Sequence, residues 1–181
     1  MEYKKILLRN KSSKIAFISV MSALTALMSL ILIPMPKPLA EYDLSPILIY
    51  AFGVLTNPLV AGLIIGIGEG IGTTIATINF GWPLVFIPGA IIVRGFEAVL
   101  ISYISQRFRP KDNATISKGE IIALVIGVIW ETLGFTIADV ILFGPGMAMI
   151  TLLTIVDTVY IPIAIPLIIY IRKTFNTYRI L

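Results

Sequence analysis

Charged side chains interrupt segments of this sequence that are otherwise apolar. Arg94 and Glu97 stand three residues apart in the stretch GAIIVRGFEAVLI, and Glu69, Glu131 and Asp157 each fall inside another apolar run. A charged side chain at the centre of a bilayer costs about 2.5–3.5 kcal/mol on insertion scales unless it is paired, protonated or hydrated. Because an arginine keeps its charge, Arg94 requires carboxylate partners.

Two interpretations of these residues remain open. In the first, they form a buried ion-pair network that fixes how the helices pack. In the second, they line a cavity that is open to the outer face of the membrane. One arginine cannot neutralise four carboxylates, so the remaining acids must be protonated, hydrated or matched by a group from outside. This imbalance favours the cavity.

Aromatic residues occur where such a cavity could use them. Trp130 precedes Glu131, Tyr160 follows Asp157 by one helical turn, and Trp82 lies in a connecting segment. Aromatic rings stack on flat ligands and attract cations, although Trp82 also suits the aromatic belt at the membrane surface.

Further acidic residues lie toward the outer mouth. Asp139 is near the outer end of its apolar run, and the stretch PMPKPLAEYDLSP carries Glu41, Tyr42 and Asp43. These three residues either form part of a lid or are simply solvated.

The composition identifies an integral membrane protein. Of the 181 residues, 57% are hydrophobic and only 13% are charged, and the mean hydropathy is +0.97. The absence of cysteine and histidine excludes disulfides, thiol and histidine catalysis, and zinc sites with nitrogen or sulfur ligands. We expect no bound metal or cofactor. The isoelectric point near 9.4 reflects basic segments between apolar runs rather than nucleic-acid binding.

The lengths of the apolar runs predict the architecture. A helix needs about 20 apolar residues to cross a bilayer. We therefore predict an all-α membrane bundle, a single domain over residues 1–181, with no removable signal peptide. Its six predicted spans lie at about 15–33, 44–56, 58–78, 84–106, 118–140 and 149–171.

The distribution of positive charge supports six spans, including the short one at 44–56. With six, twelve of the 14 basic residues fall on one side, which the positive-inside rule makes cytoplasmic together with both termini. These twelve are Lys4, Lys5, Arg9, Lys11, Lys14, Arg107, Arg109, Lys111, Lys118, Arg172, Lys173 and Arg179. At 1.5 Å per residue, Glu69, Arg94, Glu131 and Asp157 then share one depth, about 12–15 Å from the outer surface, and Glu97 lies one turn further in.

Small residues recur at helical spacing in two predicted spans. Gly62, Gly66 and Gly70 line one face of a helix, which indicates close helix packing. The first span contains two stripes, Ser19 with Ala23 and Ser22 with Ala26. Each stripe could pack inside the bundle or dock another membrane protein, and the sequence does not decide between these roles.

Two longer stretches carry a family resemblance. DLSPILIYAFGVLTNPLVAGLIIGIGEGIG and GWPLVFIPGAIIVRGFEAVLISYI resemble the second to fourth helices of the substrate-specificity (S) component of energy-coupling factor (ECF) transporters. The resemblance implies a membrane subunit that binds a vitamin-like ligand with high affinity. It also implies two kinds of partner, a transmembrane T component and two ABC ATPases. The family's docking motif would fall on Ser19 and Ala23, with serine replacing its first alanine.

The resemblance and the charge balance together suggest a ligand class. The family's pockets match Arg94, Glu97, Trp130, Glu131, Asp157 and Tyr160 by location. An excess of carboxylates favours a cationic or donor-bearing ring, so thiamine or its aminopyrimidine precursor is favoured and riboflavin is next. One alternative is a self-contained proton- or cation-coupled carrier in which buried acids titrate, although no inverted repeat is visible. Another is a metal-dependent membrane enzyme, for which no clustered acidic motif is found.

Overall fold

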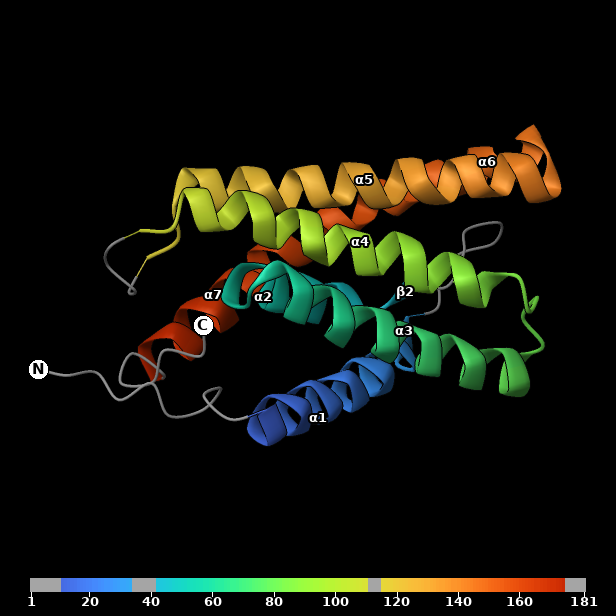
Figure 1. The fold of residues 1–181 in the computed structure, drawn as a ribbon. Helices are drawn as coiled ribbons and strands as arrows, with labels where there is room; N and C mark the ends of the chain where they lie inside the picture. The colour runs from blue at the N-terminus through green and yellow to red at the C-terminus, as the bar shows by residue number, and fades with distance from the viewer. Residues whose placement is uncertain (1–10, 34–41, 111–114, 175–181) are drawn as a thin grey trace, which may run out of the picture.

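The computed structural model describes residues 11–33, 42–110 and 115–174. This part of the chain is almost entirely helical, as Figure 1 shows, and the predicted all-α class is confirmed. Its elements are α1 (Lys11–Ser29), β1 (Leu32–Ile33), β2 (Tyr42–Asp43), α2 (Ser45–Leu55), α3 (Pro58–Phe80), α4 (Phe86–Arg107), α5 (Lys118–Phe143), α6 (Pro145–Thr151), the 3₁₀ helix η1 (Leu152–Val159) and α7 (Tyr160–Thr174).

Five stretches of helix in the described ranges are long and apolar enough to cross a membrane, namely α1, α3, α4, α5 and the continuous run of η1 and α7. The chain is therefore a multi-pass membrane protein. The sixth predicted element, α2, has only 11 residues. The cytoplasmic placement of both termini and the single domain remain predictions.

Local sequence signals determine where the helices begin and end. Asn57 caps α3 by accepting a hydrogen bond from the Val60 amide at 3.0 Å. Ser117 and Glu120 form a reciprocal capping box at the start of α5. The helices α3 and α5 stop at Gly81 and Gly144, whose φ angles of +72° and +86° suit glycine.

Glycines on α3 allow close approach on two sides. A Cβ on Gly95 of α4 would lie 3.4 Å from the Gly66 Cα, so the α3 and α4 backbones nearly touch. This confirms the packing role predicted for the Gly62–Gly66 stripe. A second pair, Gly68 and Gly72, which is not part of the predicted stripe, faces α1.

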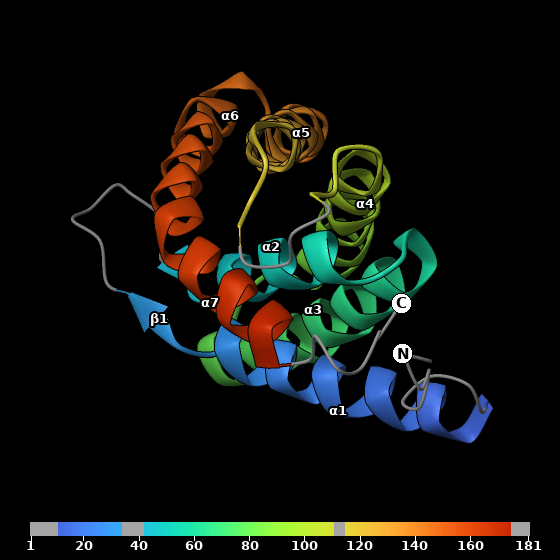
Figure 2. The ribbon, with the colours of Figure 1, turned by 90° about the vertical axis from the view of Figure 1, so that its left-hand side faces the viewer.

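The short helix α2 lies inside the bundle. Figure 2, a view roughly along the helices, shows α2 between α3, α4 and α7, and it contacts all three. Ile49, Tyr50 and Ala51 on successive faces of α2 are fully buried. A helix that is apolar all round is stable in such a position. The helices α5 and α7 are joined by the buried ion pair of Glu120 with Arg172.

Two local features differ from the sequence-based expectation. The strands β1 and β2 pair antiparallel, with Leu32 opposite Asp43, although no strand was expected. The predicted span at 149–171 is not one α-helix, because it begins in the last residues of α6, continues as the 3₁₀ helix η1 and becomes α-helical again at Tyr160.

Candidate functional site

Arg94 is the centre of a network of ion pairs among four elements. Its Nε donates to Glu131 Oε1 of α5 at 2.9 Å. Its Nη1 lies 2.8 Å from Asp43 Oδ2 of β2 and 2.8 Å from Glu69 Oε2 of α3. The Ser45 hydroxyl of α2 is a further 2.8 Å partner of Nη1. Burial is nearly complete for both glutamates, whose side chains are 1% exposed.

Asp43 is the partner that was not foreseen. The sequence predicts either a lid or a solvated role for it at the outer mouth, yet it binds Arg94 with one oxygen and accepts the Ser45 amide hydrogen bond with the other, at 2.8 Å. This second bond satisfies a free N–H at the start of α2. The sequence signal was the string DLSP, in which an acid stands two residues before Ser45 and precedes a helix that starts with proline.

Glu97 and Asp157 lie near the network without bonding to Arg94. Glu97 is fully buried, and neither of its carboxyl oxygens has a hydrogen-bond partner in the described part of the chain. Asp157, 2% exposed, lies beside Glu131 and has one such unpartnered oxygen. The structure therefore brings together Glu69, Arg94, Glu131 and Asp157, the four residues predicted to share one depth.

The charge imbalance expected from the sequence is present. One guanidinium contacts three carboxyl groups, and two more lie close by. Unpartnered oxygens also remain on Glu69 and Glu131. Buried polar atoms normally have hydrogen-bond partners, so these acceptors require protonation of some carboxyl groups, bound water or a donor from outside.

A cavity of about 170 Å³ adjoins this network. Asp43, Glu69 and Arg94 line it, and Phe135 lies against the guanidinium with 5.9 Å from the Arg94 Cζ to the ring centroid. Trp82, Phe86 and Asp139 also line the cavity. The hydroxyl of Thr151 donates to Asp139.

Five predicted site residues lie outside the lining of this cavity, namely Glu97, Trp130, Glu131, Asp157 and Tyr160. Trp130 donates its indole N–H to the Val93 carbonyl of α4 at 3.0 Å, and its ring packs 4.7 Å from that of Phe96. Tyr160 is buried in the apolar core one turn beyond Asp157. Trp130 therefore joins α5 to α4 in this structure. Direct contact of any of these five residues with a ligand remains a prediction.

The two stripes on α1 have different surroundings. Ser22 and Ala26 are buried, and the neighbouring Gly68 and Gly72 of α3 would clash with α1 if they carried a Cβ. Ser19 and Ala23 are exposed. The stripe of Ser22 and Ala26 therefore packs inside the bundle, and the stripe of Ser19 and Ala23 lies on its surface.

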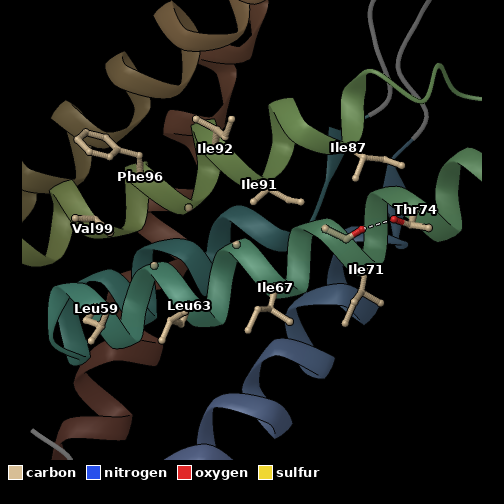
Figure 3. Close-up of a pocket in the computed structure, with 14 residues that line it drawn as sticks. Leu59, Leu63, Ile67, Ile71, Thr74, Ile87, Ile91, Ile92, Phe96 and Val99 are labelled. Carbon is tan, nitrogen blue, oxygen red and sulfur yellow. Dashed lines mark hydrogen bonds between the residues drawn. The ribbon is translucent and has the colours of Figure 1, made fainter.

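A larger groove of about 910 Å³ runs between α3 and α4 on the outside of the bundle. Figure 3 shows that aliphatic side chains such as Leu63, Ile67 and Ile91 follow it along its length. Thr74 is its one polar lining side chain among the described residues, and that hydroxyl is bonded to the Gly70 carbonyl. With no free polar group to orient a ligand, this groove suits lipid rather than a specific solute.

An all-α membrane bundle with a small, acid-rich cavity between its helices is typical of a solute-binding membrane subunit. The family model described as the S component of the ECF-type riboflavin transporter matches residues 9–171. The chain belongs to this family of ECF-type S components. An uncharacterized protein from Pyrococcus woesei, described as lying in the gap 3' region, is 28% identical over 128 residues, which cover 70% of this chain and 78% of the relative. No solved structure matches the chain.

Family membership determines the general role. The chain is a substrate-binding subunit of an ECF transporter in the cell membrane, and its family consists of transport subunits rather than enzymes. The family also implies partnership with a T component and ATPases, which supply the energy. This role replaces the self-contained carrier and the metal-dependent enzyme considered above.

Proposed function

We propose that this S component binds a flat heterocyclic vitamin in the cavity beside Arg94. The observation that supports this proposal most directly is that two residues lining the cavity carry a free hydrogen-bond donor and a free acceptor. Nε and Nη1 make all the bonds of Arg94 to the described residues, so Nη2 has no partner there. Glu69, which also lines the cavity, has an unpartnered Oε1.

A ring that carries an acceptor beside a donor would complement these two groups. The acceptor would bind Arg94 Nη2, and the donor would bind Glu69. Trp82, Phe86 and Phe135 supply aromatic surface in the same cavity. Aromatic rings stabilise flat ligands by offset or edge contacts.

Thiamine or its aminopyrimidine precursor fits this site best. The surplus of carboxyl groups favours a cationic ligand, and an aminopyrimidine presents an amine next to a ring nitrogen. The cavity volume of about 170 Å³ is below the range of about 300–1,000 Å³ that is usual for drug-sized ligands, which favours the one-ring aminopyrimidine over thiamine, which has two rings. Riboflavin is the second candidate, because the matched family is described by that vitamin.

Binding of purified protein to thiamine, the aminopyrimidine and riboflavin, measured by calorimetry, tests this proposal. We expect the thiamine-like ligands to bind in the micromolar range or tighter, and Arg94→Lys to weaken binding at least tenfold, because a lysine lacks the planar set of donors. Arg107→Lys, an exposed change at the other end of α4, is the control. Binding of riboflavin alone would support the second candidate. Absence of binding to all three, with no small molecule released on denaturation, would reject the proposal.

We also propose that the exposed stripe of Ser19 and Ala23 on α1 docks the T component. Small side chains let a partner helix approach closely in a membrane. The stripe is exposed while its neighbour at Ser22 and Ala26 is used internally, which is what two separate roles require.

A further inference from the structure

The segment that carries Asp157 has an unusual backbone. Residues Leu152–Val159 form a 3₁₀ helix of eight residues inside a membrane span. Runs of 3₁₀ helix longer than three or four residues are uncommon, because their hydrogen bonds have poorer geometry than those of an α-helix. Something outside the segment must therefore favour this conformation.

Two buried tyrosines contact the backbone of this segment from other elements. The Tyr42 hydroxyl of β2 donates to the Leu153 carbonyl at 2.7 Å. The Tyr50 hydroxyl of α2 donates to the Asp157 carbonyl at 3.2 Å. Tyr50 is fully buried and Tyr42 is 8% exposed, so both bonds are shielded from water.

Two threonines of the segment form hydrogen bonds with other carbonyls of the same stretch. Thr158 donates to the Ile155 carbonyl at 2.6 Å, and the Thr154 hydroxyl lies 2.9 Å from the Thr151 carbonyl. Four alternate carbonyls, those of residues 151, 153, 155 and 157, thus each receive a side-chain hydroxyl. Such bonds compensate for weak backbone bonds in a membrane, where water is absent.

The spacing of the two tyrosine bonds selects the 3₁₀ form. Four residues rise about 8 Å in a 3₁₀ helix and about 6 Å in an α-helix. Their rotation differs by about 80°, because each residue turns about 120° in the first and 100° in the second. If the segment became α-helical from Leu153 onward, Asp157 would shift by about 2 Å and turn away from Glu131.

We infer that Tyr42 and Tyr50 are positioning residues that hold Leu152–Val159 as a 3₁₀ helix and so place the Asp157 carboxyl beside Glu131, which is bonded to Arg94 of the proposed ligand cavity. This inference rests on the proposed function. Neither the tyrosines nor Asp157 line the cavity, so the tyrosines act on it through Asp157, its neighbour Glu131 and the ion pair of Glu131 with Arg94. Burial, followed by the negative charges of Asp157 and Glu131, raises the pKa of Tyr42 above its ordinary 10.0, so its hydroxyl remains a hydrogen-bond donor at neutral pH.

Tyr42→Phe and Tyr50→Phe remove the hydroxyls and keep the rings. Tyr170→Phe, at a side chain that is 68% exposed on α7, is the matched control. The Asp157 carbonyl still accepts the Tyr160 amide hydrogen bond in Tyr50→Phe, so the fold has no reason to fail there. We expect each variant to weaken binding of thiamine, or of riboflavin if the wild type binds that vitamin, about three- to tenfold, and the control less than twofold.

A double-mutant cycle distinguishes positioning from general stability. If Tyr50 acts through Asp157, then Asp157→Asn weakens binding less in the Tyr50→Phe background than in the wild type. Additive losses would overturn the inference. A wild-type protein that binds none of the vitamins would instead reject the proposed function.

Hydrogen–deuterium exchange of the ligand-free protein provides a readout that needs no ligand. Removal of the hydroxyls should speed exchange of the amides of residues 152–160 in both tyrosine variants, with Tyr170→Phe unchanged. Unchanged exchange in Tyr42→Phe and Tyr50→Phe would overturn the inference whatever the ligand is.

Discussion

Arg94 holds the site together at the scale of single residues. Its guanidinium joins β2, α3 and α5 by ion pairs that are nearly dry. A buried ion pair contributes little beyond its cost of desolvation, but loss of one partner leaves an unpaired charge. Arg94 therefore matters most for the geometry of the acids that surround it, because its bonds decide which carboxyl oxygens remain free for a ligand.

Asp43→Asn tests this arrangement by changing charge alone. The asparagine oxygen can still accept the Ser45 amide bond, whereas the ionic bond to Arg94 is lost. We expect the free energy of unfolding to fall by about 1.5–3 kcal/mol, the usual range for a hydrogen bond to a charged group. The change is measured by denaturant titration in detergent.

Asp139→Asn is the matched control, because Asp139 lines the same cavity but accepts its bond from a neutral threonine. We expect it to lower the unfolding free energy by less than about 1 kcal/mol. Equal losses in the two variants would show that the Asp43–Arg94 pair has no special role.

Helix α3 organises the bundle at the scale of elements. It packs against α4 through Gly62 and Gly66 and against α1 through Gly68 and Gly72. Glu69 lies between these two contacts and points to Arg94. The close approach on both sides fixes how α3 is rotated, and this rotation aims Glu69 into the site.

Gly68→Ala should separate α1 from α3. The new methyl group would lie 2.8 Å from the Ser22 carbonyl oxygen and 2.6 Å from the Thr25 Cβ, and the backbone oxygen cannot move without shifting α1. We expect a loss of about 1–3 kcal/mol in the free energy of unfolding, as for other overpacked sites. A thermal shift measurement in detergent checks the direction.

Gly89→Ala in α4 controls for the change of residue type, because a Cβ there has no neighbour within 4 Å. Alanine also favours helix over glycine, so this variant should be as stable as the wild type or more stable. Equal melting temperatures of the Gly68→Ala and Gly89→Ala proteins would contradict the packing argument.

The whole molecule has two proposed functional regions in separate places. The proposed ligand site lies between helices around Arg94, and the proposed docking stripe lies on the exposed face of α1. Substitutions in one region should therefore leave the other intact, which makes binding and assembly separable.

Ala23→Phe should block assembly with the T component while ligand affinity stays within about twofold of the wild type. A large ring on the exposed stripe would prevent the close helix approach that small residues permit. Co-purification with the T component and ATPases measures assembly, and calorimetry measures affinity.

Leu133→Phe, at a side chain of α5 that is 52% exposed, tests whether any enlarged outward-facing residue interferes. It should assemble normally. Full assembly of the Ala23→Phe protein would show that the T component docks elsewhere.

The sequence alone determined the class of protein and the common level of its buried charged residues. Membrane spans follow from the length of apolar runs, and helix ends follow from local signals such as Asn57, Ser117 and Gly81, so neither depends on distant contacts. The shared level of Glu69, Arg94 and Glu131 follows from counting residues along each span.

Only the tertiary structure decided which of these groups meet. Arg94 and Glu97 are one turn apart, yet helical side chains lean toward the helix N-terminus, so Arg94 reaches away from Glu97 and bonds to Asp43, Glu69 and Glu131. The buried stripe on α1 and the hydroxyl bonds of Tyr42 and Tyr50 also required the structure. Helix rotation and the contacts between helices set these choices, and spacing within one helix does not fix either of them.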